Sequence, residues 1–302
     1  MKDCHFEVKS MNIKAIKVNS FTSEKTGGNP AGVVLKPLGL TPNQMKKISD
    51  LLEVSETAYV FPSENADYQV RFFSPAVEVD LCGHATIATF KVLGNQLQSK
   101  SKSNTLRLTQ QTKAGVLPVQ IQFINTGEVN SVLMKQKDAI FEPVSYSPQT
   151  LAESLNINIK ELCSDLLQER VSTGLFTLPV CVSSFSVLKN MKPDFHLVKR
   201  FCRKHQVGSL HVFTFDTIES NSLYHARNFA PLYNINEDPV TGTANGAVCS
   251  YLRRHQMTRS TEIICEQGDI IHRSGRVTVK FLNDSVWVGG KAMVNESVDL
   301  TV

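Results

Sequence analysis

The sequence predicts an α/β protein of two similar domains, each with a curved sheet wrapped around one central helix. The main evidence is a repeat, because residues 71–93 and 227–252 both read as a strand, a turn with proline and glycine, and an apolar helix. Both helices carry small and apolar residues around most of their circumference, as buried helices do. Five identities occur in the same order in the two copies: Arg71 and Arg227, Phe73 and Phe229, Pro75 and Pro231, Gly83 and Gly242, and Ala85 and Ala244.

The first half alternates strands with two helices. Thr41 is a suitable capping residue and Pro42 fits the first helical position, so a helix is predicted to begin there. Its apolar face contains Met45 and Ile48. The other predicted elements are strands at 13–21, within 27–35, at 55–62 and at 68–75, the repeat helix at 83–93, and several short strands within 105–135.

The second half follows the same plan after a predicted interdomain link at residues 136–150. Helices are predicted near 148–156, around 193–204 and at 242–252, with strands near 179–188, 209–216, 222–229, 261–266, 275–281 and 285–288. We therefore expect one domain at 12–135 and another at 136–302, with the option that the last strand returns to the first domain. Residues 1–11 are polar and are interpreted as an extension.

Composition argues against several classes of protein. The chain has 302 residues, 41% of them hydrophobic, and a formal net charge of only +4. Basic residues form no stripe with interleaved aromatics, so no nucleic-acid partner is expected. No apolar run has membrane-spanning length and the N-terminus has no signal-peptide core, so no membrane partner is expected. Seven cysteines without a C-x-x-C pair indicate reduced thiols and a cytoplasmic location, and no Cys/His cluster has metal-ligand spacing.

Glycines open both repeat helices, at Gly83-His84 and at Gly242-Thr243. A helix N-terminus has unpaired N–H groups and partial positive charge, and glycine lets a ligand approach the backbone closely. If the two halves face each other, both helix starts converge on one cleft that suits a small carboxylate or phosphate. The alternative is that these are only well-formed helix starts.

Glu56 is the first candidate for acid/base chemistry. Strand alternation places it on the face of Ala58 and Val60, where burial would raise the pKa of the carboxyl group toward neutrality. The alternative is a glutamate at a strand edge that faces solvent. His84 is expected to stay neutral, because the helix dipole opposes its charging. It would then transfer a proton or bind a substrate, unless its role is structural.

Three further residues each have two interpretations. Cys82 is either a reactive thiol or a small core residue. The matching position in the second copy is Thr241, so a symmetric two-thiol site is not available. Asp238 is either a substrate ligand or a capping or loop carboxylate. Asn29 lies in a Gly-Gly-Asn-Pro turn and either reaches a ligand or shapes the turn.

Four motifs follow one another along the chain: GGNPAGVV, VSETAYV, RFFSPAVEVDLCGHAT and EDPVTGTANGA. Together they resemble the PhzF family of phenazine-biosynthesis-like isomerases, from about Lys14 to residue 294. This resemblance implies the fold of diaminopimelate epimerase, with two pseudo-symmetric α/β domains and an active site in the cleft between them. It also implies a homodimer without a metal or an organic cofactor.

The resemblance further implies roles for individual residues. Glu56 would be the catalytic acid/base, and His84 and Asp238 would bind and polarise the substrate. Backbone N–H groups would hold a substrate carboxylate in a cleft formed by Asn29, Gly83, Gly242 and Thr243. Thr243 and Asn245 replace residues common in the family; the threonine keeps a hydroxyl group, and Asn245 is expected to affect which substrate fits.

The sequence therefore predicts a cofactor-independent isomerase that moves a proton on a small carboxylate-bearing substrate. One alternative is an amino-acid epimerase or racemase that uses Glu56 with Cys82. The other alternative is a non-catalytic metabolite-binding protein, against which the complete set of Glu56, His84 and Asp238 argues. The pocket walls come from many positions, so the motifs do not name the substrate.

Overall fold

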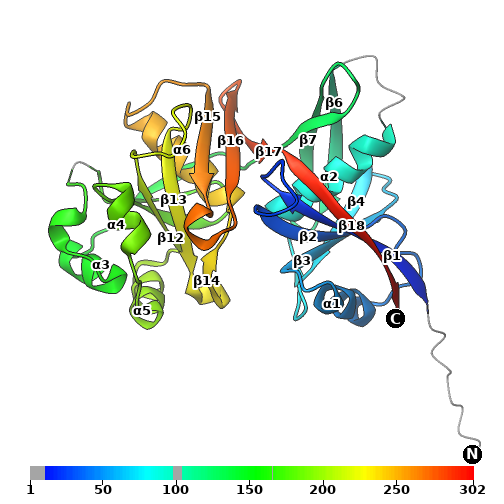
Figure 1. Ribbon diagram of the computed structural model, residues 1–302, viewed down its shortest axis with the longest axis horizontal. Coiled ribbons are helices and arrows are strands. Elements are labelled where there is room, and N and C mark those ends of the chain that lie inside the picture. The colour runs from blue at the N-terminus through cyan, green and yellow to red at the C-terminus, as the bar shows by residue number, and fades with distance from the viewer. Residues whose placement is uncertain (1–10, 98–103, 165) are drawn as a thin grey trace, which may run out of the picture.

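A computed structural model describes residues 11–97, 104–164 and 166–302. It has two lobes, in which strands surround helix α2 (Gly83–Leu97) in the first half and helix α6 (Gly242–Arg254) in the second (Figure 1). The predicted α/β fold of two similar halves is therefore confirmed. The predicted N-terminal extension lies outside the described residues, apart from Met11.

The first half contains the predicted elements around the first copy of the repeat. Thr41 and Gln44 form a capping box at the start of α1, which begins at Pro42 as predicted. α2 continues past the predicted end at residue 93 to Leu97. The elements are β1 (Asn12–Ser20), β2 (Asn29–Val34), α1 (Pro42–Leu51), β3 (Glu56–Phe61), β4 (Tyr68–Phe73), β5 (Glu78–Val79), α2, β6 (Thr105–Thr112), β7 (Gly115–Phe123) and β8 (Val129–Lys135).

The second half repeats this order with more helices. Its elements are β9 (Ile140–Pro143), α3 (Pro148–Leu155), η2 (Ile159–Glu161), β10 (Glu169–Ser172), β11 (Phe176–Cys181), α4 (Phe185–Asn190), α5 (Phe195–His205), β12 (Ser209–Thr214), β13 (Tyr224–Ala230), η3 (Pro231–Tyr233), β14 (Ile235–Asp238), α6, β15 (Glu262–Gln267), η4 (Asp269–Ile271), β16 (Gly275–Leu282), β17 (Ser285–Gly290) and β18 (Ala292–Thr301).

Two predictions for the second half are wrong in part. The strand predicted at 179–188 ends at Cys181, and residues 185–190 form α4 instead. The cause is Ser184, whose side chain accepts a hydrogen bond from Val187 N and caps the helix. The predicted link at 136–150 contains β9 and the start of α3, because β9 pairs with β10.

Strand pairing repeats in the two halves and confirms the duplication. The first half pairs in the order β1–β2–β3–β4–β6–β7–β8, and the second in the order β10–β11–β12–β13–β15–β16–β17. In both halves the second and fourth pairings are parallel and the others antiparallel. β8 pairs with β17 and so joins the halves into one sheet. β18 pairs with β1 in the first half, just as β9 pairs with β10 in the second. The predicted domain boundary between residues 135 and 136 stays a prediction.

The arginine that both copies of the repeat share makes the same kind of ion pair in each half. Arg71 Nε donates to Glu78 Oε1 at 2.8 Å and its Nη2 donates to Oε2 at 3.0 Å. Arg227 makes the same two-pronged contact with Glu237, at 2.9 and 2.8 Å. Each guanidinium also lies 5.0 Å from the ring centroid of the phenylalanine two residues later. The pair thus holds the short strand that leads into each repeat helix.

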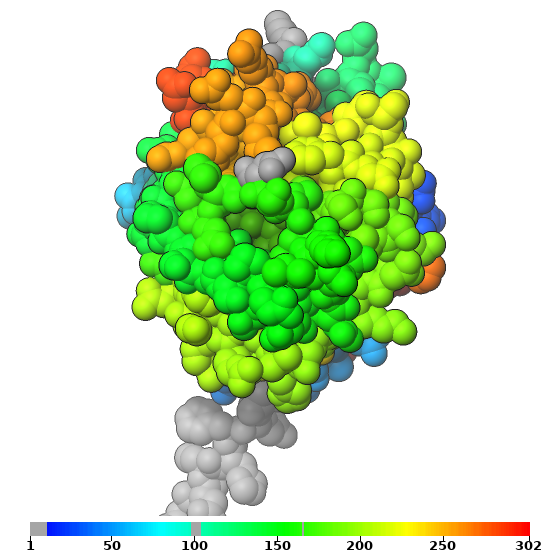
Figure 2. Space-filling view, turned by 90° about the vertical axis from the view of Figure 1, so that its left-hand side faces the viewer, coloured from blue at the N-terminus to red at the C-terminus, as the bar shows by residue number. Residues whose placement is uncertain are grey.

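The two repeat helices lie in one continuous core. Ala85 and Ile87 of α2 and Ala247 and Val248 of α6 belong to the same buried cluster, and the two helices contact each other. Their predicted burial is therefore confirmed. α3, α4 and α5 cover the outer face of the second lobe, above a second buried cluster (Figures 1 and 2). Within the described residues, no helix is both long and apolar enough to cross a membrane.

Candidate active site

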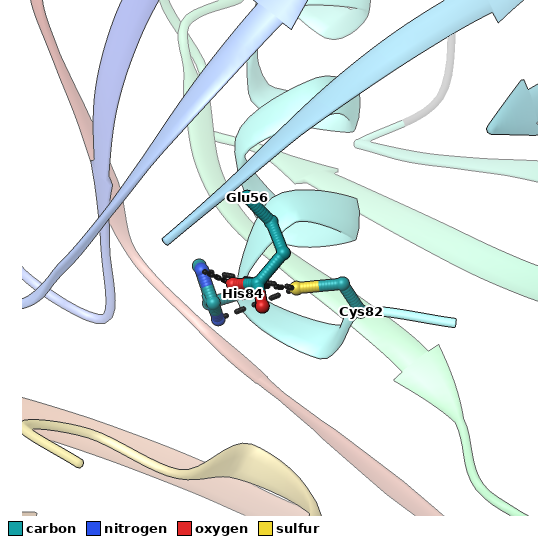
Figure 3. A group of neighbouring side chains, drawn as sticks. All are labelled: Glu56, Cys82 and His84. Atoms are coloured by element: carbon teal, nitrogen blue, oxygen red, sulfur yellow. Dashed lines mark hydrogen bonds and ion pairs between the residues drawn. The ribbon is translucent and has the colours of Figure 1, made fainter. Parts of the chain in front are cut away.

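Glu56, Cys82 and His84 come together at the amino end of α2 (Figure 3). Glu56 is the first residue of β3, Cys82 directly precedes α2, and His84 is the second residue of α2. His84 Nε2 lies 3.2 Å from Glu56 Oε2. Cys82 Sγ lies 3.8 Å from the same oxygen and 3.4 Å from His84 Nδ1. Two residues at the start of α2 thus flank a carboxylate that comes from β3.

The electrostatics of this pair differ from the expectation based on sequence. Burial raises the pKa of Glu56, but hydrogen bonds with His84, Ser55 and Cys82 and the charge of His84 bring the pKa below its usual value. Burial lowers the pKa of His84, but the contacts with Cys82 and Glu56 outweigh burial and raise the pKa to well above its usual value. The predicted raised pKa of Glu56 and neutral state of His84 are therefore wrong, because the two groups form an ion pair.

Cys82 contributes a protonated thiol to this group. Only 8% of the residue is exposed, and burial raises the pKa of the thiol more than the charge of His84 lowers it. A thiol with a raised pKa is a weak nucleophile at neutral pH and a weak hydrogen-bond donor. Its position beside Glu56 Oε2 therefore favours donation to the carboxylate.

Asp238 lies in the second half and is tied to the first half by Asn29. Asn29 Nδ2 donates to Asp238 Oδ1 and to Val240 O, both at 2.9 Å. Thr241 Oγ1 donates to the other carboxylate oxygen of Asp238. Burial raises the pKa of Asp238 more than the charge of His84 and these hydrogen bonds lower it. The amide nitrogen of Asn29 already donates two hydrogen bonds within the protein, and a direct contact between Asn29 and a substrate stays a prediction.

The two helix starts converge on this region. A β-carbon added to Gly83 would lie 4.0 Å from Thr243 Oγ1, and both residues remain partly exposed. Gly242 is buried instead. A β-carbon there would lie 3.1 Å from Val288 Cγ1 and 3.2 Å from Phe21 Cζ. Close packing is therefore a sufficient reason for the second glycine, whereas the first lies at an accessible helix start.

A buried polar support behind Asp238 was not predicted from the sequence. Gln267 Nε2 donates to Asp238 O at 2.8 Å and to Thr241 Oγ1 at 3.2 Å. Gln267 Oε1 accepts from Thr241 N and from Asn245 Nδ2. Asn245 is completely buried and also accepts from Tyr224 OH. The side chain of Asn245 thus faces the interior of the lobe and reaches Asp238 only through Gln267, so an effect of Asn245 on substrate fit stays a prediction. No local signal marks Gln267, since β15 reads as an ordinary strand.

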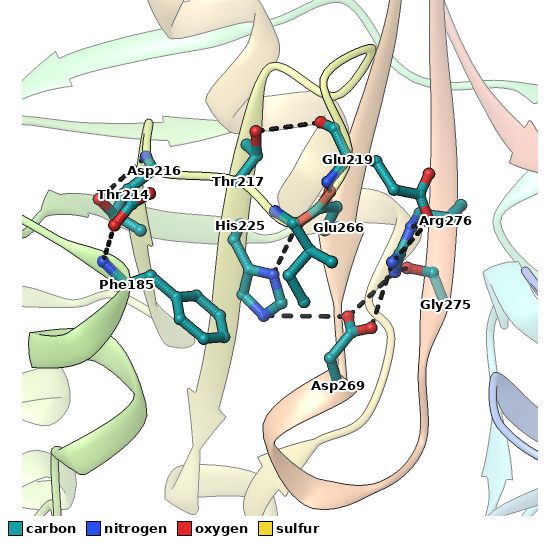
Figure 4. A network of polar contacts seen from close by, with 11 residues as sticks. Phe185, Thr214, Asp216, Thr217, Glu219, His225, Glu266, Asp269, Gly275 and Arg276 are labelled. Carbon is teal, nitrogen blue, oxygen red and sulfur yellow. Dashed lines mark hydrogen bonds and ion pairs between the residues drawn. The ribbon is translucent and has the colours of Figure 1, made fainter.

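The residue before Gln267 anchors the strand that carries this support. Glu266 is completely buried and accepts hydrogen bonds from Ile218 N, Glu219 N and His225 Nδ1, at 2.9, 2.7 and 2.8 Å (Figure 4). Burial raises the pKa of Glu266, but these hydrogen bonds outweigh it and lower the pKa to about 2. Arg276 extends the network by pairing with both Glu219 and Asp269.

Glu266→Gln is expected to destabilise the protein at pH 7 by about 2 kcal/mol, because the two backbone N–H groups meet different carboxylate oxygens and an amide offers only one acceptor. Since the pKa of Glu266 is lower in the folded than in the unfolded state, this difference exists above about pH 4.5 and shrinks as the pH falls toward 2. Urea unfolding at pH 7 and pH 3 measures both values. Glu262→Gln, an exposed change in the same strand, is the control. A difference that is equal at the two pH values would contradict the role of the carboxylate.

Comparison with known proteins identifies the family of this chain. The model of the phenazine biosynthesis-like protein family matches residues 18–297. The chain belongs to this family. Uncharacterized isomerases of Clostridium acetobutylicum and Bacillus subtilis are both 34% identical to it, covering 92% and 93% of this chain and 94% of each relative. The family resemblance found in the motifs is confirmed, and the chain is an enzyme of an isomerase family.

Solved structures extend the comparison to the fold. A PhzF-family phenazine biosynthesis protein of Bacillus anthracis is 32% identical, with a TM-score of 0.87 over 97% of this chain and 100% of that one. A hydroxyproline epimerase of Agrobacterium vitis is 11% identical, with a TM-score of 0.60 over 96% of this chain and 91% of that one. The second likeness shows only that phenazine biosynthesis-like proteins and this epimerase share the two-lobed fold.

Proposed function

We propose that the protein is a cofactor-independent isomerase that moves a proton between carbons of a small carboxylate-bearing substrate. The observation that carries the proposal is the contact of Glu56 with His84, at 3.2 Å, beside the partly exposed start of α2. A positioned carboxylate can accept a proton from carbon and return it, and the lowered pKa of Glu56 keeps this carboxyl group ionised at neutral pH. The family relatives named isomerases support the reaction class.

The proposed steps use only groups that meet at this site. Glu56 removes a proton from a carbon that the substrate's carboxylate or conjugated double bonds make acidic. The electrons of the broken C–H bond shift toward the substrate carboxylate, where N–H groups at the start of α2 and α6 stabilise the added charge. Asp238 and His84 orient a hydroxyl or amine of the substrate. Glu56 then gives the proton to another carbon, so no atom is gained or lost.

Solvent deuterium provides the test of this reaction class. The protein is incubated in D₂O with a panel of small cyclic unsaturated carboxylic acids, and products are followed by NMR. An isomerase substrate acquires deuterium on the carbon that receives the proton and shows a shifted double bond. If ligands of the panel bind but none exchanges deuterium or isomerises, the alternative of a metabolite-binding protein is supported instead.

An amino-acid epimerase is the second candidate, because Cys82 Sγ lies 3.8 Å from Glu56 Oε2 and offers a second acid. Cys82→Ala separates the two candidates. For the isomerase we expect less than about a tenfold loss of turnover, since the thiol only donates to the carboxylate. For the epimerase we expect a loss of roughly 10²–10⁴-fold, typical of a missing acid/base group. In the epimerase case, NMR in D₂O would show deuterium entering the α-carbon of amino-acid substrates with the native protein but not with Cys82→Ala.

The remaining expectations concern the state of the protein in the cell. The family resemblance implies a homodimer and a small anionic substrate, and the cysteine content predicts a cytoplasmic location. Sedimentation of the purified protein tests the dimer, with the mass of one chain being 33.5 kDa.

A further inference from the structure

The triad of Glu56, Cys82 and His84 offers one oxygen, one sulfur and one nitrogen donor to a common point. Their possible ligand atoms all lie within 4.8 Å of one another. Glu56 Oε2 lies 3.2 Å from His84 Nε2 and 3.8 Å from Cys82 Sγ, and Cys82 Sγ lies 3.7 Å from His84 Nε2. These three separations describe a nearly equilateral triangle of donors.

Such a triangle has the size of one face of a tetrahedral zinc site. Zinc binds carboxylate oxygen and imidazole nitrogen at about 2.0–2.2 Å and thiolate sulfur at about 2.3 Å. In a tetrahedron these bond lengths place neighbouring donors roughly 3.3–3.7 Å apart. The observed separations agree with this range to within a few tenths of an ångström.

We propose that Glu56 Oε2, Cys82 Sγ and His84 Nε2 bind Zn²⁺ reversibly and that the bound ion blocks proton transfer by Glu56. The ion binds as an inhibitor, because it occupies the carboxylate that must be free to act as a base. Binding displaces the protons of the thiol and the imidazole to solvent. The inhibition rests on the proposed function, whereas the binding rests on the geometry of the donors alone.

The donor set and its burial favour zinc over the abundant hard cations. Thiolate and imidazole suit Zn²⁺ and related transition metals, while Mg²⁺ and Ca²⁺ require a shell of oxygen ligands. The side chains of His84 and Glu56 are 13% and 16% exposed, so the site is shielded but reachable. Three protein donors leave a fourth position for water, as in catalytic rather than structural zinc sites.

The sequence contains no Cys/His cluster with metal-ligand spacing, so no metal site was predicted from it. A search for closely spaced ligands misses this triad because its third donor is distant in the chain. Cys82 and His84 are two residues apart, but the third donor, Glu56, comes from a strand 26 residues earlier. Only the parallel pairing of β2 with β3 and the packing of α2 against both strands bring the carboxylate to the loop.

Cobalt substitution tests the binding without any substrate. Metal-free protein is titrated with Co²⁺, and the expected result is one bound ion per chain with the visible bands of a tetrahedral site and a thiolate-to-cobalt band in the near ultraviolet. Added Zn²⁺ should then displace the Co²⁺ in a one-to-one ratio. The absence of these bands, or octahedral bands only, would overturn the proposed site.

Variants identify the ligands. Cys82→Ser should abolish the thiolate band, and Cys82→Ser and Glu56→Gln should each weaken zinc binding by at least about 100-fold, more than loss of a ligand's hydrogen-bond partner costs. Glu56→Gln is nearly isosteric and carries the test if the cysteine variant does not fold. Cys202→Ser, at a buried cysteine in α5, is the control and should bind normally. Normal binding by both triad variants would refute the assignment.

Measuring deuterium exchange with and without Zn²⁺ separates this inference from the proposed function. If Zn²⁺ binds and deuterium exchange continues at the same rate, the inhibition is refuted while the site stands. If metal-free protein never isomerises any substrate, the proposed function fails and the cobalt result is unaffected. If exchange stops at one equivalent of Zn²⁺ and returns after chelation, both parts hold.

Discussion

Replacing Glu56 by glutamine is expected to reduce turnover of the true substrate by roughly 10²–10⁴-fold, the usual contribution of a positioned acid/base. Glutamine keeps the size of the side chain and one hydrogen-bond acceptor for His84, which lies 3.2 Å from Glu56 Oε2. The amide cannot accept a proton from carbon, so the chemical step is lost while the shape of the site is kept. The rate of deuterium incorporation measures the loss, and equilibrium binding of a substrate or product should change by less than about tenfold.

Glu53→Gln is the matched control for this prediction. Glu53 is exposed and lies three residues earlier in the chain, so the same chemical change there should leave the rate within about twofold. If Glu56→Gln retains the native rate on a substrate that the native protein converts, Glu56 is not the acid/base. If the variant loses binding as strongly as rate, its role is to hold the substrate instead.

The arrangement of the site follows from features that a sequence can carry. Three local signals mark the site: Gly83 at an accessible helix start, Glu56 at the start of a strand, and Asp238 before the second repeat helix. The repeat places Gly83 and Asp238 near the starts of the two equivalent helices. If the two halves face each other, the repeat brings the two helix starts to one cleft, and in the structure Gly83 lies close to Thr243. Local pattern and duplication therefore predicted the two-lobed fold, whereas the roles of the candidate residues came from the family resemblance and stay predictions.

The protonation states could not be predicted in the same way. Burial raises the pKa of Glu56, as expected from the sequence, and a helix N-terminus in general disfavours a charged histidine such as His84. A partner at 3.2 Å outweighs both, and that distance depends on how β3 and the loop before α2 pack. The buried polar support at Gln267 is hidden for a related reason, since its four hydrogen bonds join segments that lie 22 to 29 residues apart.

Gly289→Ala is expected to lower the free energy of unfolding by at least about 4 kcal/mol, near the upper end for a single substitution. Gly289 lies in β17, opposite Leu133 of β8, where the sheets of the two halves join. An added β-carbon would lie 1.8 Å from Val132 O and 2.7 Å from Leu133 Cα. Both contacts are with backbone, so no side chain can move aside and the two strands must separate. Thermal and urea unfolding measure the effect.

The same substitution should also impair the site, because Asn29 and Asp238 meet at 2.9 Å across the halves that this strand pair joins. Any folded fraction of Gly289→Ala is therefore expected to lose turnover as well as stability, although residue 289 lies outside the candidate site. Ser285→Ala, in the same strand, is the control and should change the free energy of unfolding by less than about 1 kcal/mol. A Gly289→Ala protein with native stability would show that β8 and β17 do not pair at this register, and the relation of the two lobes would have to be revised.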